Sequence, residues 1–289
     1  MKEALILYNA ELDTGVFKNQ YESYVNSFEK LGVSAKACPS SKYISALFDS
    51  ETANNKPDVV IFLDKDVNGA ALLEMKGYTL YNGSECIRIC DDKALTYLTL
   101  YKSGLPIPKT VIAPKTYSSA QQEDWCRKAA ELIGYPIVIK ECFGSLGMQV
   151  YLANDESGML EKVKGIGQKP FVLQEFLPKG AGWDLRVIVA GGEVIGAIKR
   201  SNATDFRANA ARGGSVEVAI LTKEQQALAI KASEATGAFF AGVDLIMGED
   251  GFLICEVNSN MLFDAAEKAL GISVSDKIAE KVKKHCLNK

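Results

Sequence analysis

Short apolar runs alternate with helix-like segments along the first part of the chain. Residues 4–8 and 59–63 are typical of buried strands, and residues 79–81 of a shorter one. Residues 19–31 predict a helix that ends at Gly32. Strands that alternate with helices in this way predict a small α/β unit built on a parallel sheet.

The pattern of the remaining chain predicts a mixed segment followed by a strand-rich one. Asp91 is expected to cap a helix that runs to Ser103 and stops at Gly104. The other expected strands are 110–113, 136–140, 149–152, 171–176, 185–190, 193–199 and 215–220, and the other expected helices are 119–132, 223–236, 263–270 and 275–286. No internal repeat is visible in this order of elements.

Two apolar runs near the end of the chain carry oxygen-bearing side chains. Asp244 lies in the run 241–247, and Glu256 and Asn258 lie in the run 251–258, with a Gly- and Asp-containing turn between the runs. Such a link predicts a hairpin, and alternation puts Glu256 and Asn258 on the same face. Three hard oxygen ligands on one face favour Mg²⁺ or Mn²⁺. The plainer alternative is that Asp244 caps a turn and Glu256 pairs with a lysine.

A lysine and a glycine turn are consistent with a second site, one that binds an anion. Lys140 ends the apolar strand 137–140, where an ammonium needs an anion or access to water. Gly144, Ser145 and Gly147 follow it, and glycines let backbone N–H groups approach a phosphate. A simple turn with a lysine that reaches water explains the same residues, so the two interpretations stand side by side.

Arginines are concentrated in residues 183–214. Arg186, Arg200, Arg207 and Arg212 lie there, whereas lysine supplies most of the charge elsewhere. Because the guanidinium fork fits carboxylate and phosphate, this concentration indicates an anionic partner. Asp184 and Arg186 alternate along one strand and share a face. The strand before this segment ends in Glu175 and Phe176, where backbone groups suit an adenine edge and a phenyl ring suits its face.

Composition narrows the class of protein. The chain has 289 residues, a formal net charge of −3 and 47% hydrophobic residues, as expected for an enzyme of two or three domains. The acidic balance argues against nucleic acid and anionic membranes as partners. The apolar start is too short for a signal peptide, and no run is long enough to span a bilayer. Seven cysteines without a CxxC pair predict a reducing cytoplasm. A single histidine, His285, makes a histidine-based triad or zinc site implausible.

Taken in order, these motifs resemble the ATP-grasp superfamily and, within it, the RimK-like carboxylate–amine ligases. The resemblance is carried by Gln174-Glu-Phe, Asp184-Leu-Arg186, Lys199-Arg200, Asp205-Phe-Arg-Ala-Asn209, Arg212-Gly-Gly214, Ala241-Gly-Val-Asp244 and Glu256-Val-Asn258. It implies an ATP-grasp architecture of mixed α/β class. The implied units are an N-terminal parallel α/β domain (1–88), a central lid (89–173) and a C-terminal antiparallel domain that binds metal and nucleotide (174–289).

The resemblance also implies roles for individual residues. ATP would contact Lys93, Lys140, Gly144, Ser145, Gly147, Glu175, Phe176, Asp184, Arg186 and Arg207. Asp244, Glu256 and Asn258 would bind Mg²⁺ or Mn²⁺, as two ions. Arg200 and Arg207 would be catalytic, facing the γ-phosphate and an acyl phosphate. The second substrate would lie near Asn209, Arg212, Gly213, Ser259 and Asn260. The family usually continues after the metal-binding Asn into a Pro-Gly turn, and this chain has Ser259-Asn260-Met261 instead.

The implied activity is an ATP- and Mg²⁺-dependent ligase that joins a carboxylate to an amine through an acyl phosphate. An amino acid such as glutamate is one expected substrate, and the other is a metabolite, a peptide or a protein tail. The alternatives are phosphoryl transfer to another acceptor and a nucleotide-binding regulatory module without turnover. Neither nucleic acid nor a membrane is expected as a partner, and a homo-oligomer is left open.

Overall fold

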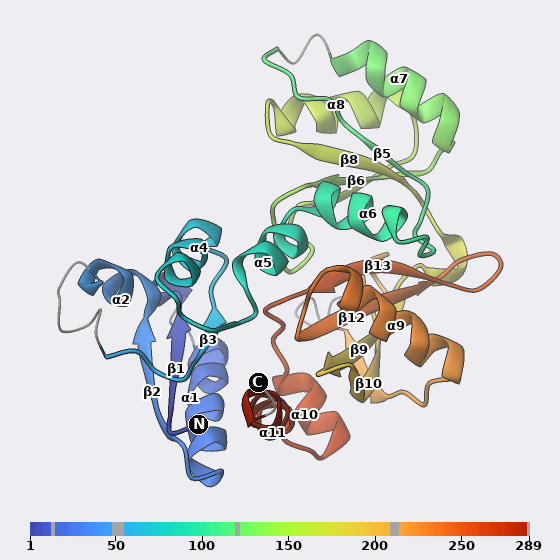
Figure 1. The fold of residues 1–289 in the computed structure, drawn as a ribbon. Coiled ribbons are helices and arrows are strands. Elements are labelled where there is room, and N and C mark those ends of the chain that lie inside the picture. The colour runs from blue at the N-terminus through green and yellow to red at the C-terminus, as the bar shows by residue number, and fades with distance from the viewer. Residues whose placement is uncertain (13–14, 48–54, 119–121, 209–213, 288–289) are drawn as a thin grey trace.

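Three sheets form the framework of the molecule (Figure 1). The structure is a computed structural model that describes residues 1–289 except 13–14, 48–54, 119–121, 209–213 and 288–289. The sheets have the strand orders β2-β1-β3-β4, β5-β8-β6-β7 and β11-β10-β9-β12-β13. The fold is therefore of mixed α/β class, as the sequence predicts.

The N-terminal sheet is parallel and covered on both faces. It consists of β1 (Glu3–Tyr8), β2 (Ser34–Pro39), β3 (Val59–Leu63) and β4 (Leu80–Tyr81), and its helices are α1 (Gly15–Lys30), α2 (Ser40–Ala46), α4 (Val67–Met75) and α5 (Ser84–Asp91), with the 3-10 turn η1 (Ala10–Leu12) after β1. Ile6 and Ile61 pack toward α1, whereas Leu5 and Phe62 pack toward α2 and α4. Since helices cover both faces, every residue of β3 is apolar and buried.

The central sheet is antiparallel. Its strands are β5 (Thr110–Ile112), β6 (Ile137–Glu141), β7 (Val150–Ala153) and β8 (Phe171–Glu175), and the helices of this part are α6 (Lys93–Lys102), α7 (Gln122–Ile133) and α8 (Glu156–Ile166). The expected cap of α6 is wrong by one residue. Asp92 accepts hydrogen bonds from the Ala94 and Leu95 amides, whereas Asp91 is the last residue of α5.

The C-terminal sheet is also antiparallel and contains the expected hairpin. Its strands are β9 (Trp183–Ala190), β10 (Glu193–Ser201), β11 (Ser215–Val218), β12 (Phe240–Met247) and β13 (Phe252–Asn258), accompanied by η3 (Pro178–Gly180), α9 (Lys223–Ala235), α10 (Asp264–Leu270) and α11 (Val274–Leu287). The expected unit boundaries fall inside elements. Residue 88 lies within α5, and residue 173 lies within β8, which pairs with both β5 and β6.

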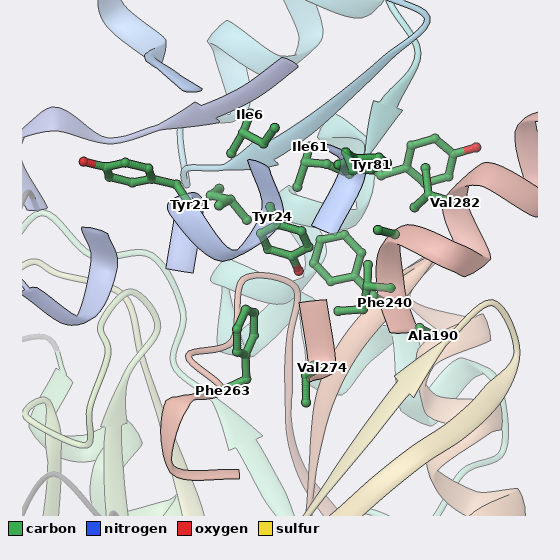
Figure 2. Close-up of a cluster of buried hydrophobic side chains, with 14 of the residues drawn as sticks. Ile6, Tyr21, Tyr24, Ile61, Tyr81, Ala190, Phe240, Phe263, Val274 and Val282 are labelled. Atoms are coloured by element: carbon green, nitrogen blue, oxygen red, sulfur yellow. The ribbon is translucent and has the colours of Figure 1, made fainter. Parts of the chain in front are cut away.

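A shared core joins the N-terminal sheet to the C-terminal sheet. Figure 2 shows Ile6, Tyr24 and Ile61 of the first unit facing Phe240 and Phe263 of the last. The ring of Tyr24 lies 6.2 Å from that of Phe240 and 5.7 Å from that of Phe263, centroid to centroid. Aromatic burial of this extent fixes α1, and the face of the parallel sheet that it covers, against the start of β12 and the segment after β13.

The histidine and most cysteines have packing roles. The His285 ring lies against Tyr81 and Phe239, and its Nδ1 is 2.5 Å from the Tyr81 hydroxyl. Cys86, Cys90, Cys126 and Cys142 are buried, and all seven cysteines are free thiols. In the part of the chain that the structure describes, no helix has the length and apolar character needed to cross a membrane.

Candidate functional site

A cavity between the central and C-terminal sheets gathers most of the predicted site residues. Its lining includes Lys93, Lys140, Gly144, Ser145, Gly147, Glu175, Phe176, Asp184, Arg200, Arg207, Asp244 and Glu256. Arg186, Asn258, Ser259 and Asn260 are described but do not line it. Asn209, Arg212 and Gly213 lie outside the described residues. Segments far apart in the sequence therefore place their cations and carboxylates around one space.

Four charged side chains form a buried network on the cavity face of the C-terminal sheet. Arg186 lies opposite Asp244 across β9 and β12, and Asp184 lies opposite Arg200 across β9 and β10. Arg186 donates from Nε and Nη2 to the Asp244 carboxylate, with Nη2 2.7 Å from Oδ2. Arg200 donates from Nε to Asp184 at 2.7 Å, and its Nη2 is 3.0 Å from Asp244 Oδ2. The strand register alone brings these groups together.

The network shifts the pKa values of its two carboxyls in opposite directions. Burial tends to raise the pKa of Asp244, but the guanidiniums of Arg186 and Arg200 outweigh it, so the pKa is lowered. Burial and the nearby charge of Asp244 raise the pKa of Asp184. The lowered pKa keeps Asp244 ionised at neutral pH, which is the state that a metal ligand requires.

We predict that Asp244→Asn destabilises the metal-free protein. The substitution removes one member of a buried ion pair and leaves Arg186 without its carboxylate, which costs about 3 kcal/mol. Urea unfolding in a chelating buffer measures the free energy of unfolding. Asp250→Asn, in the exposed turn after β12, is the matched control. Equal stability of the two variants would contradict a structural role for the network.

The predicted metal ligands share one face of the β12–β13 hairpin. Asp244 lies directly opposite Glu256, and Gly242 lies opposite Asn258. Asn258 donates its Nδ2 to the Gly242 carbonyl at 3.3 Å, which leaves its amide oxygen as the acceptor. Among the described residues, no three His, Cys, Asp or Glu side chains are placed to hold a metal ion together, so the Asn258 amide oxygen is the candidate for a third protein ligand beside Asp244 and Glu256. Two carboxylates and an amide fit Mg²⁺ or Mn²⁺ in donor chemistry.

A β-bulge widens the part of the hairpin that faces the cavity. The pairing shifts after Asp244, because Leu245 lies opposite Ile254 and leaves Cys255 as the additional residue. Cys255 and Glu256 both line the cavity as a result. Asp244 lies within β12 and does not cap a turn, so that part of the plainer alternative is wrong, whereas Glu256 does pair with a lysine, Lys93, as that alternative expected.

Lys93 and Lys140 extend the positive charge across the cavity. Lys93 Nζ is 3.7 Å from Glu256 Oε1 and 3.4 Å from the Gly144 carbonyl. Lys140 is buried, and its Nζ is 3.0 Å from the Tyr97 hydroxyl. Burial tends to lower the pKa of Lys140, but Cys255 and Tyr97 outweigh it, so the pKa is raised and the ammonium remains charged. A buried cation directed at a cavity is suited to bind an anion there.

The glycine turn connects β6 to β7 and is held from the opposite sheet. Leu146 and Gly147 adopt positive φ angles of 56° and 68°. Arg207 donates from Nη1 to the Gly147 carbonyl at 2.8 Å and to the Val150 carbonyl at 2.9 Å, while its Nε and Nη2 bind Asp205. Arg207 thus links the β10–β11 connection to the turn above the cavity.

The cavity lining also contains apolar side chains, most of which could not be identified from the sequence. Phe176 was expected there, but Val138, Leu177, Phe206 and Ile246 were not. The Phe206 ring lies 6.4 Å from that of Phe176. Glu175 uses its own amide N–H for the Lys109 carbonyl, and its carboxylate accepts from the Lys109 amide. Alternation along each strand could indicate which side chains share a face, but not which faces enclose this cavity.

Comparison with known proteins gives consistent matches. The RimK-like ATP-grasp domain family matches residues 90–282. N-acetylaspartylglutamate synthase A of Homo sapiens is 34% identical over 238 residues, which cover 78% of this chain and 59% of that protein. A probable alpha-L-glutamate ligase of Syntrophotalea carbinolica is 32% identical over 216 residues, covering 73% and 69%. The solved ATP-grasp ligase PsnB, complexed with minimal precursor, Mg and ADP, has a TM-score of 0.72 and 15% identity and covers 98% of each chain.

Proposed function

Because the chain belongs to the RimK-like ATP-grasp family, we propose that it joins a carboxylate to an amine at the expense of ATP, with glutamate as one substrate. The observation that carries the proposal is the cavity, where Lys93, Lys140 and Arg200 face the carboxylates of Asp244 and Glu256. Cations beside hard oxygen ligands suit a metal-bound polyphosphate. Glutamate is supported by the human and Syntrophotalea relatives, an N-acetylaspartylglutamate synthase and a probable alpha-L-glutamate ligase.

We assign the nucleotide to the full length of the cavity. The adenine lies against Phe176 and next to Glu175. Asp184 contacts the nucleotide, whereas Arg186 acts through Asp244, which it holds by two hydrogen bonds. The phosphates are held by Lys93 and Lys140 and by the glycine turn, through Gly144, Ser145 and Gly147. This assignment is supported by the cavity lining, which contains the paired rings of Phe176 and Phe206 as well as the cations Lys93 and Lys140.

Asp244, Glu256 and Asn258 are proposed to hold Mg²⁺ or Mn²⁺, as two ions. A metal held by these residues would supply positive charge to neutralise the transferring phosphoryl group. Two carboxylates that lie opposite each other, together with the Asn258 amide oxygen, form a donor set of hard oxygens, which supports this face as a place for a divalent cation. The solved PsnB complex with Mg and ADP gives a precedent on the same fold.

The chain's own residues then bind and orient the reacting groups. The substrate carboxylate attacks the γ-phosphorus, ADP leaves, and an acyl phosphate forms. The amine attacks the carbonyl carbon of this intermediate, phosphate leaves with the C–O bonding pair, and the amine loses a proton. Arg200 and Arg207 are proposed to stabilise the negative charge in both steps. Arg207 also holds the glycine turn, which excludes water from the acyl phosphate.

Substrate-dependent product formation tests this proposal. Purified protein with MgATP, L-glutamate and a panel of carboxylates and amines should release ADP and phosphate. It should also yield an adduct with the mass of the two substrates minus one water. ATP binding without any adduct would favour a regulatory module, and a phosphorylated acceptor would favour phosphoryl transfer. Either result would overturn the ligase proposal.

A further inference from the structure

Two buried amide side chains from the N-terminal unit hold the segment that follows the proposed metal ligand Asn258. Asn82 follows β4, is 1% exposed, and donates from Nδ2 to the Ser259 carbonyl at 2.8 Å. Gln20 on α1 is 2% exposed and donates from Nε2 to the Met261 carbonyl at 2.8 Å and to Asn260 Oδ1 at 3.2 Å. Residues 259–261 are therefore fixed by groups more than a hundred positions away in the sequence.

Asn82 also ties this segment to the start of β12. Its Nδ2 donates to the Phe240 carbonyl at 2.9 Å, and its Oδ1 accepts from the Phe239 and Phe240 amides at 2.7 and 3.3 Å. All the hydrogen-bonding capacity of this amide is thus used in a buried position. The start of β12 and the end of β13, the two strands with the proposed metal ligands, are held together at one point.

The held segment is in contact with the acidic site. Met261 and Arg186 both approach Gly242, where an added Cβ would lie 3.0 Å from Met261 Sδ and 2.9 Å from Arg186 Cδ. Gly242 also accepts the hydrogen bond of Asn258. A shift of residues 259–261 would therefore reach both Asn258 and the guanidinium that holds Asp244.

The Gln20 side chain also lines a small cavity at the carboxyl edge of the parallel sheet. Gln20 contributes to it together with Tyr8, Asn9, Phe17 and Leu63. Tyr8 and Leu63 are the last residues of β1 and β3, and the carboxyl end of parallel strands is where open α/β sheets bind ligands. The Gln20 side chain thus connects this edge of the sheet to the held segment.

We propose that Gln20 and Asn82 are positioning residues that hold residues 259–261 for the second substrate, the partner of glutamate. The N-terminal unit then sets specificity for that substrate through these two amides. This inference rests on the proposed ligase function. It explains how the chain orders the segment after Asn258 without a Pro-Gly turn: side-chain amides supply the constraint that turn residues would otherwise give.

The test uses isosteric variants of the full chain. Asn82→Asp and Gln20→Glu replace donors with oxygen atoms that face carbonyl groups. Ser27→Ala is the matched control, because Ser27 is a buried polar residue between α1 and α11 that bonds Ser275 and Asp276 but not residues 259–261. Hydrogen–deuterium exchange of the 259–263 backbone amides gives a readout that needs no turnover.

The backbone amides of residues 259–263 should exchange about 10-fold faster in Asn82→Asp and in Gln20→Glu than in Ser27→Ala, because each of the two variants loses a buried hydrogen bond. The KM for the second substrate identified by the panel should rise about 10-fold, and this rise should exceed any rise in the KM for ATP. Unchanged exchange in both variants would overturn the inference. So would faster exchange with an unchanged KM for the second substrate. If the wild-type protein forms no adduct, the ligase proposal fails, and the exchange result alone still decides whether the two amides hold the segment.

Discussion

Glu256→Gln is expected to lower metal-dependent turnover by at least about 100-fold while the fold is retained. Glu256 is more exposed than Asp244, the other carboxylate proposed as a metal ligand. Among the described residues, its only ion pair is with Lys93, whose Nζ lies 3.7 Å from Glu256 Oε1. Neutralising it removes one proposed metal ligand and little of the packing. Steady-state ADP release over a range of Mn²⁺ concentrations measures the effect, and circular dichroism checks the fold.

Glu249→Gln is the matched control for this variant. Glu249 lies in the turn of the same hairpin and pairs with Lys179 at the surface. Its substitution should leave both turnover and the Mn²⁺ dependence unchanged. If Glu256→Gln behaves like this control, the assignment of the hairpin face to a metal is wrong.

Arg207→Lys is expected to have the second large effect, a loss of about 100-fold in turnover. The guanidinium of Arg207 reaches Asp205 and the carbonyls of Gly147 and Val150 at the same time. An ammonium keeps the charge but cannot bridge three acceptors with fixed geometry. The glycine turn would lose its connection to the opposite sheet, and the acyl phosphate would lose a preorganised donor.

These two losses are distinguished by measuring how the acyl phosphate divides between adduct formation and hydrolysis. Arg207→Lys should release more phosphate than adduct, because an open turn admits water to the acyl phosphate. Arg127→Lys is the control, since Arg127 is a surface arginine with carboxylate partners on α7 and α8. Equal phosphate-to-adduct ratios in wild type and Arg207→Lys would show that Arg207 does not protect the intermediate.

Local patterns in the sequence were sufficient to predict features that depend on a single strand or a single hairpin. The alternation of Glu256 and Asn258, and the turn before them, predicted the β12–β13 hairpin that the structure contains. β3 was predicted from its apolar run. By contrast, β2 has mixed polarity in the sequence SAKACP, and α8 contains Gly158 and Gly165, so neither carries a strong periodic pattern.

Contacts between distant segments could not be predicted in this way. The bond between Arg186 and Asp244 depends on the register of β9 against β12, and those strands are not consecutive. The bulge that turns Cys255 and Glu256 toward the same cavity depends on a pairing shift that no local motif marks. Gln20 and Asn82 were missed for the same reason, since their partners lie far along the chain.

The central claim is that a carboxylate is activated as an acyl phosphate, and transfer of a carboxylate oxygen tests it most directly. The carboxylate substrate identified by the panel is labelled with heavy oxygen and incubated with MgATP and the amine. The released phosphate is then analysed by mass spectrometry. The proposed mechanism predicts one labelled oxygen in each phosphate formed with adduct, because the carbonyl–oxygen bond breaks when the amine attacks. Unlabelled phosphate together with adduct would contradict it.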